Sequence, residues 1–191
     1  GTPHQPKNYF NKVELIAYSL MPDHFHLLIN QVARGSLESF IRSLCTRYSI
    51  YFNKKYQRTG ALFEGPYKSI QIAHGDKLPL LTRYLHIPHA YSSYLEYLGL
   101  RETLWVKPNA VLSFFDKGKS AYRDFVKTRK LNQKEKDLLN SITFESEAQH
   151  LENRSNARNE QAQPDQNLKP RLRMPIFMVL STAMFLLLFT L

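Results

Sequence analysis

The chain has 191 residues, enough for one domain with a packed core and further segments beside it. Hydrophobic residues make up 43% and aromatic residues 13% of the chain, which excludes a disordered protein. The formal net charge of +10 favours a polyanionic partner, either nucleic acid or an anionic membrane surface. Cys45 is the single cysteine, so an intrachain disulfide is excluded and a reducing compartment is favoured.

The first part of the chain predicts two strands and a long helix. Residues 13–21 and 24–31 are rich in β-forming side chains and are separated by the turn dipeptide Pro22-Asp23, a pattern typical of a hairpin or of two adjacent strands. From Ser36 apolar residues recur every three or four positions. This spacing predicts an amphipathic helix that has Ser36 as its N-cap and runs to about Tyr56.

The middle of the chain predicts one more strand and several helices. Residues 61–72 alternate and contain Gly65-Pro66, which suits a bent or edge strand better than a central one. The stretch from Lys77 to Ile87, which includes Tyr84, has a helical period and stops at Pro88. Short helices are expected after it, around residues 92–98, 109–115 and 119–128.

The last part of the chain changes character twice. Residues 130–173 are polar and charged, which predicts a solvated helix or a disordered linker. Residues 174–191 are apolar and follow Arg171 and Arg173, so we expect an apolar helix there. Its uncharged run from Pro175 to Leu191 would be about 25 Å long at ~1.5 Å per residue, near the lower limit for crossing a ~30 Å hydrocarbon core. Burial in the core of the domain is a competing account, although a polar stretch of some forty residues precedes the run. Read-through or frameshifted sequence without a selected role is a further alternative. The predicted organisation is a domain over residues 1–129, a linker over 130–173 and a tail over 174–191.

The sequence His24-Phe25-His26 carries the first chemical signal. Residues two apart in a strand project from the same face, so the two imidazoles can form half of a divalent-metal site. An isolated pair of this kind binds metal in roughly one case in five and is otherwise a solvated or hydrogen-bonded pair. Here the pair opens a strand that looks buried, where two polar rings need partners.

Tyr84 is the candidate nucleophile, although in a chain with 11 tyrosines a core aromatic is the common alternative. A nucleophilic tyrosine needs help with its developing charge, and Arg83 and His86 are local groups that can supply it.

Basic and aromatic residues alternate between Arg42 and Lys68, where Glu64 is the one acid. This pattern suits phosphate contacts with base or sugar stacking, while a solvated helix face is an equal alternative. A second basic cluster from Lys117 to Lys136 favours nucleic acid. The DNA-contacting residues that we expect are Arg47, Lys54, Lys55, Arg58, Lys68 and Arg83.

Four blocks in order resemble the REP-associated tyrosine transposases, a branch of the insertion-sequence-200-like HUH transposases. The octet from Met21, Met-Pro-Asp-His-Phe-His-Leu-Leu, resembles the family's Met-Pro-Asn-His-Phe-His strand. The other blocks are Arg-Thr-Gly-Ala-Leu-Phe-Glu-Gly-Pro-Tyr-Lys from Arg58, Arg-Tyr-Leu-His-Ile from Arg83, and Tyr-Ser-Ser-Tyr-Leu-Glu-Tyr-Leu-Gly from Tyr91. The resemblance runs from about Val13 to Phe125.

The resemblance implies an α+β, ferredoxin-like HUH domain in which the histidine strand is central and the tyrosine helix packs across it. It implies Mg²⁺ or Mn²⁺ at His24 and His26, and Tyr84 as the nucleophile that forms a 5′-phosphotyrosine and leaves a free 3′-OH. The implied substrate is single-stranded or hairpin DNA. Apart from the resemblance, we expect a homodimer and a cytoplasmic, nucleoid-associated location, with or without membrane anchoring through residues 174–191.

The sequence also departs from the family pattern. The family has Asn, or Gln in relatives, four residues after the tyrosine, and Pro88 stands there in this chain. His86 or His89 would then have to complete the metal site, or the ion would have fewer protein ligands. The family's first strand and helix are missing, so we expect an N-terminally truncated domain. The alternatives are a decayed, catalytically inactive DNA-binding remnant and a membrane-associated basic protein unrelated to DNA.

Overall fold

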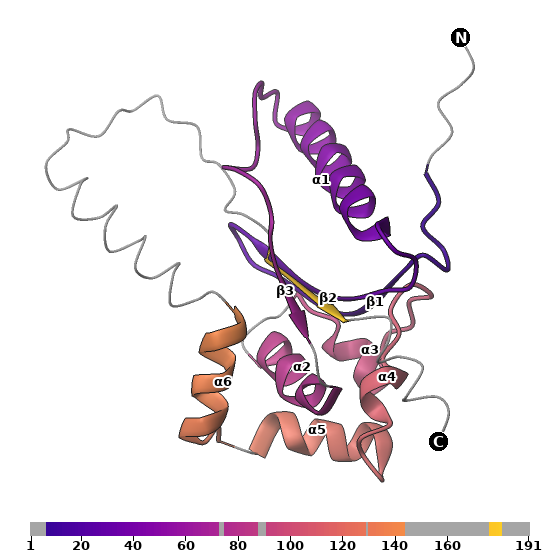
Figure 1. Cartoon of the computed structure of the whole chain (residues 1–191), viewed down its shortest axis with the longest axis vertical. Coiled ribbons are helices and arrows are strands. Elements are labelled where there is room, and N and C mark those ends of the chain that lie inside the picture. Colours follow the sequence, from indigo (N-terminus) through magenta and orange to yellow (C-terminus); the bar gives the residue numbers. More distant parts are fainter. Residues whose placement is uncertain (1–6, 73–74, 88–90, 129, 144–175, 181–191) are drawn as a thin grey trace, which may run out of the picture.

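A four-stranded sheet lies between one long helix and a layer of shorter helices (Figure 1). The computed structural model describes residues 7–72, 75–87, 91–128, 130–143 and 176–180. The strand order is β1-β2-β4-β3. Helix α1 covers one face of the sheet, and α2 with the helices that follow it covers the other. The predicted α+β class is confirmed.

The predicted hairpin is confirmed. Strands β1 (Val13–Leu20) and β2 (Phe25–Gln31) pair antiparallel, and the Met21 N–H donates to the His24 carbonyl oxygen at 2.9 Å to close the turn. A bulge in β1 between Leu15 and Ala17 interrupts the alternation, so that Ile16 and Ala17 both join the core on the α2 side. In β2 the alternation is regular, with Leu27 and Ile29 packed in the cluster on the α1 side and Leu28 in the cluster on the α2 side.

Helix α1 (Ser36–Lys55) confirms the predicted long helix, although its first cap differs from the prediction. Gly35, with φ of 74°, is the N-cap, because this left-handed conformation is accessible to glycine at little cost. Ser36 is the first helical residue, and its hydroxyl bonds the carbonyl oxygens of Lys12 at 2.8 Å and Ala33 at 2.6 Å. It therefore ties the helix start to the residue before β1.

Strand β3 (Lys68–Ile72) is an edge strand, as predicted, but it begins after Gly65-Pro66 and is shorter than the expected 61–72. The 3₁₀ turn η1 (Gly75–Lys77) leads into α2 (Leu78–His86), which carries Tyr84. Leu81 and Leu85 of α2 are fully buried against the sheet.

The predicted short helices are present as α3 (Tyr94–Leu98), α4 (Asn109–Leu112) and α5 (Gly118–Thr128). The segments that join them cover the outer edge of β1. Ser93 N–H donates to the Tyr18 carbonyl oxygen at 3.1 Å, and Lys107 N–H donates to that of Leu15 at 2.8 Å. An edge bonded in this way is closed to pairing with another chain.

Helix α6 (Gln133–Thr143) lies in the stretch predicted as a charged linker. Its Leu139 is 5% exposed and belongs to the core cluster on the α2 side, so this part of the stretch packs on the domain. Residues 144–173 lie outside the described part of the chain. The division into segments at residues 130 and 174 stays a prediction.

The prediction of an apolar helix over residues 174–191 is wrong for the part that the structure describes. Residues Ile176–Leu180 form strand β4, which pairs parallel with β2 on one side and with β3 on the other. An unbroken apolar run suits a strand buried on both faces as well as it suits a helix in lipid, so the pattern alone was ambiguous. Among the described residues no helix is long and apolar enough to cross a bilayer. Residues 181–191 lie outside the described part.

Candidate metal and nucleophile site

His24 and His26 lie side by side at the start of β2. Their ring centroids are 5.0 Å apart and the ring planes are nearly perpendicular, at 80°. His26 is fully buried, while the His24 side chain is 22% exposed and lies at the rim. The same-face spacing predicted from the sequence therefore places one imidazole inside the protein and the other at the solvent boundary.

Asp23 orients the outer histidine. Its Oδ1 lies 2.7 Å from Nδ1 of His24, a distance at which the ring N–H donates to the carboxylate. This bond leaves Nε2 as the ring nitrogen that can bind a metal, and carboxylates commonly hold metal-binding histidines in this way. Asp23 was noted in the sequence only as a turn residue.

Tyr84 lies next to the inner histidine. Its ring is 5.9 Å from that of His26 between centroids, at an interplanar angle of 81°. The buried Leu81 and Leu85 fix α2 against the sheet, and Tyr84 is half-buried beside them. The structure thus brings together the three residues predicted to carry the chemistry, from two elements far apart in the sequence.

Ser19 adds a buried hydroxyl to this group. It is the register partner of His26 in β1, and cross-strand partners share one face of a sheet. Its side chain is fully buried, and its Oγ has no hydrogen-bond partner among the described residues. Sequence analysis missed Ser19, although a two-residue turn at Pro22-Asp23 fixes this pairing and could have indicated it.

His86 does not complete the metal site in this structure. Its Nδ1 is 2.6 Å from the Tyr122 hydroxyl and its Nε2 is 2.8 Å from Oγ of Ser93, so both ring nitrogens are engaged. Burial lowers the pKa of His86 from 6.5 to about 3, which keeps the ring neutral. In this structure His86 is therefore engaged elsewhere, and the expectation that His86 or His89 replaces a lost ligand stays a prediction, since Pro88 and His89 lie outside the described residues.

Two histidines and an orienting carboxylate fit a partial metal site. No group of three or more His, Cys, Asp or Glu side chains suited to a metal ion occurs among the residues that the structure describes. A bound ion would take its remaining ligands from water and from substrate oxygens, as is common for Mg²⁺.

The predicted DNA-contacting residues of α1 are exposed. Arg47, Lys54 and Lys55 all lie on the solvent side, and Nζ of Lys55 is 5.4 Å from the ring centroid of Tyr56. Arg58 is half-buried, with its guanidinium carbon 5.6 Å from the ring centroid of Phe52.

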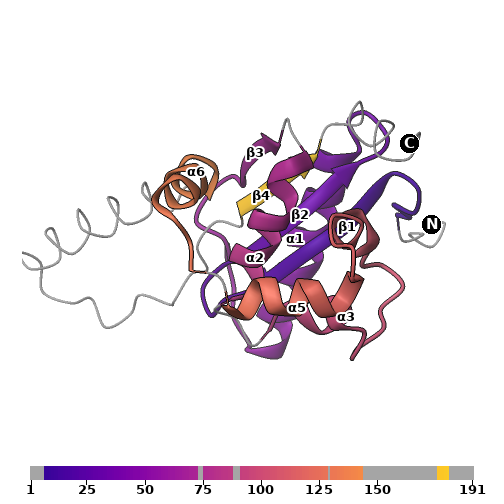
Figure 2. The same ribbon diagram turned by 90° about the horizontal axis from the view of Figure 1, so that it is seen from below.

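A chain of aromatic rings joins this end of α1 to the start of β2. Phe25, the neighbour of His24, lies 6.2 Å from Phe63 between centroids, and Phe63 lies 6.3 Å from Tyr48 on α1. Helices α1 and α2 lie on opposite faces of the sheet (Figure 2). The ring contacts place the C-terminal half of α1 at the same end of the sheet as Phe25 and its neighbour His24.

Lys68 and Arg83 differ sharply in their placement. Lys68 and His26 are both in register with Ile176, so they share one row across the sheet. Side chains two apart in a strand lie on the same face, so Lys68 shares its face with Ile70 and Ile72, which pack on the α2 side. Lys68 is therefore on the face that carries the candidate site. Arg83 is 3% exposed, and its guanidinium faces Phe125 at 5.3 Å, so it does not present its charge to DNA at the surface.

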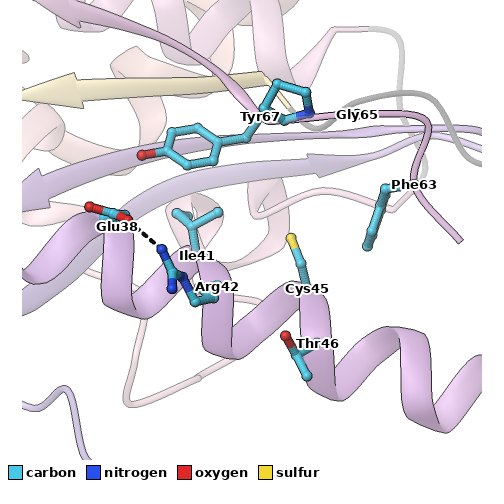
Figure 3. Close-up of a pocket in the computed structure, with 9 residues that line it drawn as sticks. Glu38, Ile41, Arg42, Cys45, Thr46, Phe63, Gly65 and Tyr67 are labelled. Carbon is cyan, nitrogen blue, oxygen red and sulfur yellow. Dashed lines mark hydrogen bonds and ion pairs between the residues drawn. The ribbon is translucent and has the colours of Figure 1, made fainter. Parts of the chain in front are cut away.

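A separate cavity of about 400 Å³ lies on the α1 face (Figure 3). It is lined by Glu38, Ile41, Arg42, Cys45, Thr46, Phe63, Gly65, Pro66 and Tyr67. Burial raises the pKa of the Cys45 thiol to about 11, which keeps it protonated and poorly nucleophilic. The sheet separates this cavity from His26 and Tyr84.

Residues 7–87 match the family model described as "Transposase IS200 like". The matched residues include β1, β2, α1, β3 and α2, and with them both histidines and Tyr84. The match shows that this part of the chain is similar to the IS200-like transposases, and it is not specific to the REP-associated branch. Searches among curated proteins and among solved structures gave no significant match.

Proposed function

We propose that this chain nicks and joins single-stranded DNA as an IS200-like transposase, with Tyr84 as the nucleophile and Mg²⁺ or Mn²⁺ held by His24 and His26. The observation that carries the proposal is the contact between the rings of His26 and Tyr84. A tyrosine beside two same-face histidines is what metal-assisted attack on a phosphodiester requires.

Each residue of the site has a separate role in the proposed reaction. When bound, the divalent ion supplies Lewis-acid polarisation of a phosphoryl oxygen. The phenol of Tyr84 loses its proton to solvent water, its oxygen attacks the phosphorus, and the new O–P bond forms a 5′-phosphotyrosine. The bond from phosphorus to the 3′ oxygen breaks, and that oxygen gains a proton to become a free 3′-OH. Asp23 holds the ring of His24 in place, and Lys68 supplies positive charge on the same face.

The DNA path that we propose follows the basic and aromatic end of α1. Exposed Arg47, Lys54 and Lys55 would contact phosphates, while exposed rings such as Tyr51 and Tyr56 offer stacking surfaces. These residues lie at the same end of the sheet as His24, so a single strand of DNA could pass from α1 to Tyr84. The same proposal includes hairpin DNA as the substrate, membership of the REP-associated branch and a ferredoxin-like topology, which rest on the motif resemblance. It also includes a homodimer and a nucleoid location.

A covalent-trapping experiment tests the nucleophile. Incubation with Mn²⁺ and hairpin oligonucleotides should give a protein–DNA adduct that survives denaturation, and peptide mapping should place it on Tyr84. Tyr84→Phe should lose the adduct, while Tyr91→Phe, which changes an exposed tyrosine in a neighbouring segment, should keep it. An adduct on another tyrosine, or an undiminished adduct in Tyr84→Phe, contradicts the assignment.

A decayed, DNA-binding remnant is the second candidate, favoured by the lack of a third metal-ligating side chain among the described residues. The same assay separates the two. A parent chain that shifts hairpin DNA in a gel but yields no adduct with either Mn²⁺ or Mg²⁺ is a binding remnant.

A further inference from the structure

Strands β2 and β3 run in the same direction but are not neighbours. Both pair parallel with β4, which lies between them in the order β1-β2-β4-β3 (Figure 1). Adjacent strands are about 4.8 Å apart, so the facing edges of β2 and β3 are separated by about 10 Å, the width that one strand fills. Without that strand, each edge would leave a row of backbone N–H and C=O groups unpaired.

The occupant comes from far along the same chain. Ile176 is in register with His26 on one side and Lys68 on the other, and the pairing continues to Leu180 with Asn30 and Ile72. The sequence Ile-Phe-Met-Val-Leu contains no charge, glycine or proline and includes β-branched Ile176 and Val179. These are the features of a central parallel strand covered on both faces.

Strand β3 depends on this occupant for its place in the sheet. It is the edge strand, and β4 is its neighbour in the strand order. Its side chains Ile70 and Ile72 still contact the core, but its described ladder hydrogen bonds are those with β4. The pairing of β3 should therefore be lost when β4 leaves.

We propose that the facing edges of β2 and β3 form a strand-binding site for an apolar, extended peptide in the parallel orientation, and that Ile176–Leu180 is its occupant in cis. Residues Ile176–Leu180 are then a removable part of the sheet. The inference does not depend on the proposed function, because backbone pairing and not DNA chemistry carries it.

Hydrogen exchange on the full-length chain tests the proposal. Met178→Pro removes a backbone donor from the middle of β4, and Met178→Leu is the matched control that keeps it. In the proline variant the amides of β3 should exchange at least about tenfold faster than in the control. The Leu20 and Ser93 amides, which bond across the outer edge of β1, serve as internal references and should change less.

Each outcome decides the question. Faster exchange of the β3 amides in Met178→Pro, either alone or together with the rest of the domain, supports a docked strand. A segment that does not pair with the sheet could not change the exchange rates of these amides when it is mutated. Equal exchange and equal melting temperatures in the parent, Met178→Pro and Met178→Leu chains would overturn the proposal.

A peptide added in trans tests the binding site itself. A synthetic peptide of residues 174–182 should restore protection of the β3 amides in the Met178→Pro chain, whereas the same peptide with Met178→Pro should not. No restoration at any peptide concentration would show that no such site exists. Unprotected β3 amides in the parent chain, together with binding to phosphatidylglycerol vesicles, would assign the segment to lipid instead.

Discussion

His26 of β2 and Tyr84 of α2 lie edge to face, with ring centroids 5.9 Å apart. The inner histidine is fixed by the strand, and the tyrosine is fixed by the buried leucines of its helix.

Metal binding should depend on the outer histidine and its carboxylate. We expect His24→Ala to abolish measurable Mn²⁺ binding, and Asp23→Asn to weaken it about 10–100-fold, since an orienting partner contributes to metal affinity on that scale. Isothermal titration with Mn²⁺ measures both. His86→Gln is the control, because both ring nitrogens of His86 are engaged within the core. Parental affinity in a His24→Ala/His26→Ala chain would rule out the metal pair.

Acid should destabilise the fold through His86. The pKa of this residue is lowered by burial from 6.5 to about 3, so between these values the unfolded chain binds a proton that the folded chain does not. The contribution of His86 to the free energy of unfolding is therefore complete above pH 6.5 and is lost as the pH falls toward 3. Denaturant unfolding should show the parent losing about 1.4 kcal/mol per pH unit more than His86→Gln in this window. Parallel pH profiles for the two chains would contradict the assignment.

The ion pair between the buried carboxylate of Glu96 and the exposed guanidinium of Arg101 should stabilise the segment after α3. Glu96 is 6% exposed and accepts bonds from Arg101 at 2.8 and 2.7 Å. Burial raises the pKa of Glu96, but the bonds from Arg101 and Thr103 outweigh it and bring the pKa below its ordinary value.

Arg101→Met leaves that carboxylate without its main partner, and we expect a loss of roughly 2–3 kcal/mol in the free energy of unfolding. The exposed pair of Arg123 and Asp124 provides the matched control, for which Arg123→Met should cost less than about 0.5 kcal/mol. Similar losses for both variants would show that burial of the pair does not matter.

DNA affinity should depend on salt through α1. A plot of the logarithm of the binding constant against the logarithm of the salt concentration has a negative slope. Each phosphate contact that is lost from a complex with single-stranded DNA reduces the magnitude of this slope by about 0.7. Arg47→Ala, Lys54→Ala and Lys55→Ala combined should therefore reduce the slope by about 2, as measured by fluorescence anisotropy over a salt series. Lys107→Ala removes an exposed charge beside β1 and should leave the slope unchanged. Equal slopes in all chains would move the DNA-binding face elsewhere.

Local patterns in the sequence determined much of this protein. The alternation around Pro22-Asp23 and the three-to-four spacing after Ser36 were sufficient to predict the hairpin and α1, because period and turn chemistry act over a few residues. The same-face spacing of His24 and His26, and the position of Tyr84 in a helix, followed from the same rules. Their meeting in space was expected from the motif resemblance and not from periodicity.

Other features depended on contacts between distant segments. The buried state of Arg83 and the engagement of His86 by Tyr122 and Ser93 arise from α5 and α3 packing on α2, which no local pattern encodes. The apolar run at Ile176–Leu180 illustrates the limit most clearly. A helix in lipid and a central strand both favour an unbroken apolar sequence, so composition does not distinguish between them. The pairing of Ile176–Leu180 with the facing edges of β2 and β3 decides in favour of the strand.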